Sequence, residues 1–112
     1  MISDSKPNFI ENIKGSINLN KSSISPYNNE LVNWIYHSRV KTLKWVLDQN
    51  ENNNLNLLKK IVLSKIQSLK KEKKKAGYRI DTIRITEEID NLEFCLHAIL
   101  QDINRIMPIK KF

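Results

Sequence analysis

The chain has 112 residues, of which 40% are hydrophobic and 28% charged, and this is the size and composition of one globular domain. Two glycines and three prolines are few for the many turns of an all-β fold, so the composition favours long helices with short connections. A net charge of +7 makes nucleic acid, acidic proteins and anionic membrane surfaces eligible partners. No apolar run approaches the roughly 18 residues that span a bilayer, which excludes a membrane span.

The expected location follows from the cysteine count and the start of the sequence. Cys95 is the only cysteine, so an intramolecular disulfide is excluded. Residues 1–7 carry no apolar segment of a signal peptide. We therefore expect an intracellular, reducing location, in the cytoplasm or an organelle interior, and no secretion.

The basic charge has two explanations at this stage. The chain contains 15 lysines and only 4 arginines, together with 16 isoleucines and 14 asparagines. Lysine, isoleucine and asparagine are favoured by AT-rich coding sequence, so the composition of an AT-rich genome is one explanation of the charge. Arginine, the better residue for bidentate contacts with phosphates and bases, is scarce. Compositional bias and a functional basic surface both remain open.

Residues 1–25 are mostly polar and are expected to form a partly ordered arm. The spacing of Phe9, Ile10 and Ile13 predicts a short helix from Pro7 to Lys14, which Gly15 would end. The stretch 16–25 is rich in serine and asparagine and is expected to be an extended loop.

The next predicted helix runs from Pro26 to about Gln49, with Ser25 as its N-cap and the asparagine-rich segment 50–54 as the loop that follows. Its apolar residues cover roughly 240° of the helix, more than an ordinary surface helix shows. Either the helix is central in the monomer, or it is shared between the core and an interface. We favour the interface, because three helices can hardly enclose one of them. The candidate protein-interface residues are Leu31, Trp34, Tyr36, Arg39, Lys41 and Trp45.

Arg39 lies within this apolar arc, where an unpaired buried charge would be costly. The simplest interpretation is that its aliphatic stem packs while its guanidinium reaches solvent. The alternatives are an ion pair with Glu88 or an acidic group supplied by a partner.

A helix from Leu55 to Lys75 is predicted by one apolar stripe, formed by Leu55, Leu58, Val62, Ile66 and Leu69. Lysines crowd its last turns, where cations meet the negative end of the helix dipole, and Gly77 follows. Its basic face is either a solvated surface or a nucleic-acid contact. Without aromatic residues it offers no stacking platform for single strands. The candidate nucleic-acid contacts are Lys59, Lys60, Lys70, Lys71 and Lys74.

The last predicted helix spans about Ile83 to Met107, with Asp81 or Thr86 as its N-cap; a short strand over 79–86 is the alternative. Pro108 stops it, and residues 108–112 form a tail. Its apolar residues follow an unbroken spacing of four and three: Ile85, Ile89, Leu92, Leu96, Ile99, Ile103 and Ile106. Three helices of this kind predict an all-α fold, an antiparallel three-helix bundle over 26–107, with no further domain boundary.

Catalysis has little support in this sequence. Glu93, Cys95 and His97 are the only cluster of reactive side chains, but Cys95 and His97 are two residues apart on a helix and face different ways. The cluster also offers too few ligands for a metal. We expect no enzyme activity, no cofactor, no metal and no small-molecule substrate. Phe94 points away from the apolar stripe and is a candidate contact for the arm or for a partner.

The sequence therefore predicts a non-catalytic helical protein-interaction module: an adaptor, regulator or assembly subunit that binds another protein, as a homodimer or in a larger complex. The alternative is a small basic nucleic-acid-binding protein that uses the lysine-rich face of the 55–75 helix.

Overall fold

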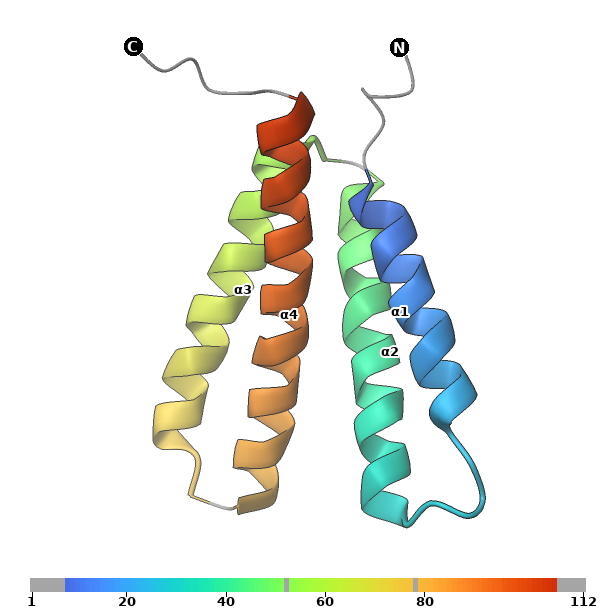
Figure 1. Ribbon diagram of the computed structural model, residues 1–112. Coiled ribbons are helices and arrows are strands. Elements are labelled where there is room, and N and C mark those ends of the chain that lie inside the picture. Colours follow the sequence, from blue (N-terminus) through green and yellow to red (C-terminus); the bar gives the residue numbers. More distant parts are fainter. Residues whose placement is uncertain (1–7, 52, 78, 107–112) are drawn as a thin grey trace.

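The computed structural model describes residues 8–51, 53–77 and 79–106 (Figure 1). These residues form four helices and no strand: α1 (Phe9–Ser23), α2 (Glu30–Asn50), α3 (Leu55–Lys75) and α4 (Arg79–Ile106). Figure 1 shows that each helix runs roughly opposite to the one before it. The all-helical class is confirmed. The three-helix count is wrong, because α1 adds a fourth helix.

The helices pack as two pairs. α1 lies on α2, and α3 lies on α4. The pairs meet mainly where α2 contacts α4, with smaller contacts of α1 with α4 and of α2 with α3, while α1 and α3 do not touch (Figure 1). All four helices supply side chains to one continuous core; its largest fully buried members are Phe9, Ile13, Leu43, Leu58, Ile85, Leu92 and Ile99. None of the helices in the described ranges is long and apolar enough to cross a membrane.

Helix α1 corrects the expectation of a loop over 16–25 and of a separate arm. Phe9, Ile13 and Ile17 are buried at every fourth position, so the apolar stripe continues past Gly15. Gly15 is exposed, and neither glycine has a positive φ, so Gly15 sits inside the helix instead of ending it. Burial against α2 outweighs the weak helix propensity of glycine, worth about 1 kcal/mol. The predicted start at Pro7 lies outside the described residues.

The start of α2 differs from the Ser25–Pro26 prediction. The helix begins at Glu30, and the Asn29 side chain accepts a hydrogen bond from the Val32 amide at 2.9 Å. The connection before it is held by Asn33, whose Oδ1 accepts from the Ser25 amide and whose Nδ2 donates to the Ser25 carbonyl at 2.8 Å. These side-chain hydrogen bonds hold the segment after Ser25 in a turn, although Ser25 and Pro26 are residue types that favour the start of a helix.

The predicted bounds of α3 are confirmed at both ends, and Asn54 is its N-cap, accepting from the Leu57 amide at 2.9 Å. Helix α4 begins at Arg79, earlier than the predicted Ile83, so Asp81 and Thr86 lie inside the helix and neither is its N-cap. The strand alternative over 79–86 is therefore wrong. The predicted end at Met107, the Pro108 stop and the tail lie outside the described residues.

Candidate functional site

A groove opens between α2 and α3, because these two helices pack on α4 more than on each other. Its volume is about 450 Å³. The lining side chains come from all three helices: Trp34, Ser38, Lys41, Thr42 and Trp45 of α2, Lys65, Leu69 and Glu72 of α3, and Arg84, Glu88 and Leu92 of α4. We call this surface the α2–α3 groove.

The α2–α3 groove has an apolar floor and aromatic walls. Leu69 and Leu92 are buried at its base. Trp34 and Trp45 are both half-buried. They lie on the same side of α2, because their separation of eleven positions corresponds to about three helical turns. Trp45 also packs on the core, and Lys65 Nζ lies 5.9 Å from the centroid of its ring. The groove thus exposes part of both indoles, the largest apolar side chains of the chain.

The charged residues of the groove differ in how they are paired. Arg84 contacts Glu72 at 3.1 Å and Glu88 at 2.8 Å. The hydrogen bond to Glu72, and then that to Glu88, raises the pKa of the Arg84 guanidinium above its ordinary value. Lys41 on α2 and Lys65 on α3 form no ion pair among the residues that the structure describes. Among the described residues, the groove therefore has one cation free of ion pairs on its α2 wall and one on its α3 wall.

The structure divides the predicted interface residues between two faces. Trp34, Lys41 and Trp45 lie together in the α2–α3 groove. Tyr36 and Arg39 project from another side of α2, with the Arg39 guanidinium carbon 5.7 Å from the Tyr36 ring centroid. Leu31 is exposed near the start of α2. It lines neither the α2–α3 groove nor a second groove of the molecule, which Arg39 lines. These six residues are therefore not one surface.

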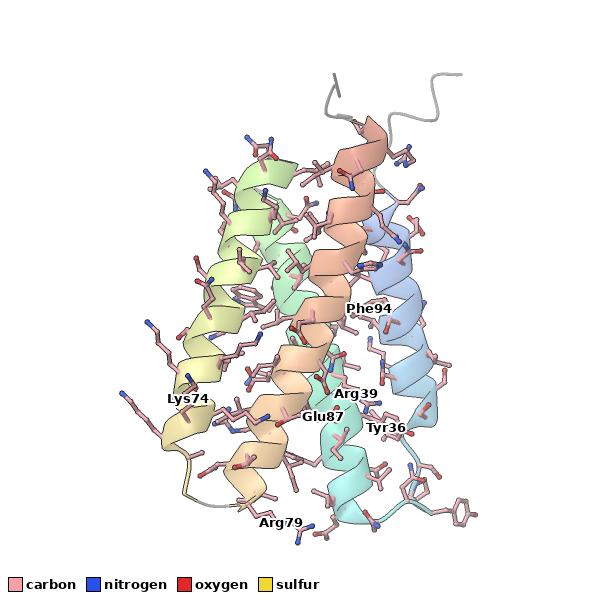
Figure 2. All side chains as sticks on the ribbon, turned by 60° about the vertical axis from the view of Figure 1, so that its left-hand side comes forward. Tyr36, Arg39, Lys74, Arg79, Glu87 and Phe94 are labelled. Carbon is pink, nitrogen blue, oxygen red and sulfur yellow. The ribbon has the colours of Figure 1, made fainter. Side chains whose placement is uncertain are left out.

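Arg39 is paired within the molecule. Its Nε donates to Glu87 Oε1 at 2.7 Å, and the Arg39 side chain is 35% exposed (Figure 2). The predicted partner Glu88 is wrong, because successive positions on α4 point about 100° apart and Glu88 turns toward Arg84 instead. The partial exposure agrees with an aliphatic stem that packs and a charged head that reaches the surface.

A second, shallower groove of about 340 Å³ lies beside this pair, between α1 and α4. Leu19 and Phe94 are exposed on its two walls, and Asp90 also lines it. Phe94 thus faces the helix that replaces the predicted arm, as Figure 2 also shows by its place on α4.

Helix α1 also explains the wide apolar arc of α2. It covers a side of α2 that a three-helix bundle would have left open, while α4 covers another. Much of the arc is therefore core, including Val40, Leu43 and Val46. The strip with the two tryptophans stays partly open, as does Leu31 near the start of α2.

The candidate nucleic-acid lysines also occupy more than one surface. Lys60, Lys71 and Lys74 are exposed and share one side of α3. Lys70 turns toward α4, where its Nζ lies 3.6 Å from Glu93 Oε2, and Lys59 is half-buried on that side.

The structure does not bring the reactive cluster together. Cys95 is buried, and desolvation raises the pKa of its thiol to about 12. His97 is exposed and contacts Gln101, while Glu93 pairs with Lys70. Within the described ranges no three histidine, cysteine or acidic side chains are grouped so as to hold a metal ion.

Sequence reasoning missed part of the groove. Ser38 and Thr42 follow Trp34 at helical spacing and could have been found from that pattern. Lys65, Arg84 and Glu88 carried no such signal, because their place in the groove depends on how α3 and α4 pack beside α2.

Comparison with models of known protein families, with curated proteins and with solved structures finds no match to this chain.

Proposed function

We propose that this protein is a non-catalytic interaction module, an adaptor, regulator or assembly subunit, whose α2–α3 groove binds a helix of another protein. The observation that carries the proposal is that both tryptophans of the chain open onto this one groove. Tryptophan is enriched among the residues that dominate binding energy at protein interfaces, and it is most effective in pockets that exclude water.

The chemistry of the groove favours an amphipathic helix with acidic residues beside its apolar stripe. A helix laid into a groove between two helices places leucine-like side chains at every third or fourth position against the floor. The two indoles offer most of that apolar contact, because Leu69 and Leu92 at the floor are only 3% and 1% exposed. Lys41 and Lys65 line the same groove, so acidic residues on the flanks of the incoming helix could form ion pairs with them.

The Glu72–Arg84–Glu88 ion pairs supply a further element of selectivity. Arg84 already serves two carboxylates, so the groove gains little from a third acid at that position. A partner that carries a lysine there would instead meet the two glutamates. We therefore infer a partner whose flanks are acidic beside Trp45 and mixed in charge beside Arg84.

A model peptide tests this proposal directly. An amphipathic helical peptide of about 18 residues, or five turns, with leucines along one face, glutamates on both flanks and one lysine at the end that would lie beside Arg84, is titrated against the protein by calorimetry. We expect saturable binding, and much weaker binding of the same peptide with lysine in place of glutamate. Lys41→Glu together with Lys65→Glu should weaken binding roughly tenfold, whereas Lys14→Glu with Lys21→Glu, on α1, should change it less than about twofold.

The tryptophans are tested separately from the charges. Trp34→Ala should weaken binding by roughly thirtyfold or more, as expected for an interface hot spot. Trp34 is the better choice because Trp45 packs on the core, so Trp45→Ala also lowers stability. Thermal melts of Trp34→Ala by circular dichroism establish that the fold is retained. Equal binding of both peptides, or full affinity in the folded Trp34→Ala variant, would contradict the proposal.

A second copy of this chain is the other occupant that the measurement must recognise. Light scattering gives the mass in solution at low and high protein concentration. If the wild type is a dimer and Trp34→Ala is a monomer, the α2–α3 groove is the interface and its occupant is a second copy of the chain. A strict monomer that binds no acidic peptide would overturn the proposed function.

A further inference from the structure

The side of α3 that points away from the core forms a continuous basic surface. Its buried stripe is Leu58, Val62, Ile66 and Leu69. From Lys60 to the end of the helix, the residues opposite this stripe fall within an arc of about 100° and are all exposed; the exposed Leu57 lies on the same side in the first turn. We call them the outer face of α3: Lys60, Ser64, Gln67, Lys71, Lys74 and Lys75.

This surface has no acidic neighbour on its own helix that remains unpaired. Glu72 is the only acid of α3, and it contacts Arg84 on the groove side. Lys60, Lys71, Lys74 and Lys75 form no ion pair with any residue that the structure describes. An ordinary solvated face mixes charges of both signs, and the outer face of α3 carries only one.

The distribution of charge also separates this surface from a general compositional bias. Helix α3 holds eight lysines and one glutamate, while α4, its neighbour, holds three arginines and six acids. A bias in coding sequence would spread lysines over all helices instead of concentrating them in one. Dipole stabilisation explains lysines in the last turn of α3, such as Lys74 (Figure 2), but it falls off within one turn and does not reach Lys60.

We propose that the outer face of α3 binds the phosphate backbone of double-stranded nucleic acid, without reading its sequence. From Lys60 to Lys75 the face is about 22 Å long, which matches roughly six base-pair steps. Ser64 and Gln67 lie between the lysines and can donate hydrogen bonds to phosphate oxygens.

Other polyanions fit this surface less well. The face carries no aromatic side chain on which the bases of a single strand could stack. It carries no arginine for bidentate contacts with bases. A helix that lies on an anionic membrane needs an apolar face to insert, whereas the apolar stripe of α3 is buried in the bundle and its exposed leucines, Leu57 and Leu63, form no such face. A duplex backbone requires only positive charges and hydrogen-bond donors along a line.

The binding of a fluorescent DNA duplex of about 24 base pairs, measured by anisotropy at several KCl concentrations, tests this inference. Four lysine–phosphate contacts predict a slope of log K against log salt of about −3.6, so that affinity falls roughly 150-fold between about 50 and 200 mM. Lys60→Gln, Lys71→Gln and Lys74→Gln together should reduce the size of this slope by about 2.7. An RNA duplex should show the same pattern, because the ligand chemistry is the backbone.

The matched control is Lys14→Gln, Lys21→Gln and Lys44→Gln, which removes the same charge from exposed positions on α1 and α2. It should leave the slope within about 0.5 of the wild type. Thermal melts should show both triple variants folded, since glutamine is nearly as good a helix former as lysine.

Three results would overturn the inference: no duplex binding at the lowest salt, an equal loss in the control variant, or tighter binding to a single strand or to anionic phosphatidylserine vesicles than to the duplex. The outcome is independent of the proposed function, because the outer-face variant should still bind the acidic peptide in the α2–α3 groove.

Discussion

Asp102 is the residue whose role the sequence concealed most completely. It is 2% exposed, and its Oδ2 accepts the backbone N–H of Phe9 at 2.7 Å, although the two residues are 93 positions apart. The side chain of Asn8, the local N-cap of α1, makes no capping hydrogen bond to the first turn of the helix. A carboxylate from α4 therefore accepts a hydrogen bond from a backbone N–H of the first turn of α1, which has no partner within the helix. Its negative charge also interacts favourably with the positive end of the α1 dipole. In the sequence Asp102 reads as one of several surface acids of the last helix, because nothing local marks a cap supplied from so far away.

Replacing Asp102 should therefore cost more than replacing a surface acid. Asp102→Ala leaves a buried N–H without an acceptor and should lower the free energy of unfolding by about 2 kcal/mol. Urea unfolding followed by circular dichroism measures the loss. Asp90→Ala, at an exposed position of the same helix, is the control and should stay within about 0.5 kcal/mol of the wild type. Equal effects of the two variants would show that Asp102 does not cap α1.

Cys95 should be chemically inert in the folded protein. Burial raises the pKa of its thiol from 9.0 to about 12, so the reactive thiolate is scarce at pH 8. Ellman's reagent at pH 8 should label the thiol only in urea, at the rate of unfolding. Rapid labelling of the native protein would contradict this description of Cys95.

The same pKa shift fixes the sign of a pH dependence. The folded pKa lies above the unfolded one, so the contribution of Cys95 to stability is complete below pH 9.0 and is lost as pH rises toward about 12. The urea midpoint should fall over this range less steeply in Cys95→Ala than in the wild type. An identical fall in both proteins would show that the thiol contributes nothing to it.

At the scale of the element, prediction succeeded where one apolar stripe and one strong terminator agreed. Helix α3 has its stripe from Leu58 to Leu69 and begins after the asparagine run, so both of its ends could be found from the sequence. The full length of α1 could not be predicted. Its apolar stripe is sparse, and Gly15 and the serine and asparagine residues after it favour a loop. Its stability comes from burying Phe9, Ile13 and Ile17 against other helices, which no local pattern reports.

Gly15→Ala distinguishes the two descriptions of α1. Gly15 lies in mid-helix, has no positive φ, and leaves open space where a Cβ would stand. Alanine should therefore stabilise the protein by about 0.5–1 kcal/mol, measured by urea unfolding. If Gly15 instead ended a shorter helix in a left-handed conformation, the same change would destabilise the protein.

The N-cap of α3 gives a second test at this scale. Asn54→Ala removes the hydrogen bond to the Leu57 amide and should cost about 1 kcal/mol of unfolding free energy. Asn56→Ala, two residues later at an exposed helical position, is the matched control and should be neutral or slightly stabilising, because alanine is the better helix former. A loss of equal size at both positions would argue against the cap.

At the scale of the whole molecule, the candidate site depends on an arrangement that one helix cannot reveal. The spacing of Trp34 and Trp45 puts both on one side of α2, and this follows from the sequence alone. The sequence does not show whether another helix covers that side. In the structure α1 covers a different part of the apolar surface of α2, and α3 contacts α2 only sparsely, so the tryptophan side stays partly open. The second wall of the groove, with Lys65, was not predictable, because it requires the register of α3 against α2.

Segregated charge is the other property of the whole molecule. The basic helix α3 and the acidic helix α4 are neighbours, yet only Lys70–Glu93 and Arg84–Glu72 join them as ion pairs. Most of the lysines of α3 therefore face solvent instead of stabilising the bundle. Surface pairs contribute about 0–1 kcal/mol each, so the fold does not require this concentration of charge.

The emission of the two tryptophans is the most direct measure of whether the α2–α3 groove takes up a partner helix, because the groove holds both indoles of the chain. In the free protein, acrylamide should quench this emission in part, since both indoles are half-buried. Saturation with the acidic amphipathic peptide should shift the emission to shorter wavelength and protect it from acrylamide, and Lys41→Glu with Lys65→Glu should move the midpoint roughly tenfold higher. Binding of the peptide with no change in emission or quenching would place the partner elsewhere and contradict the account.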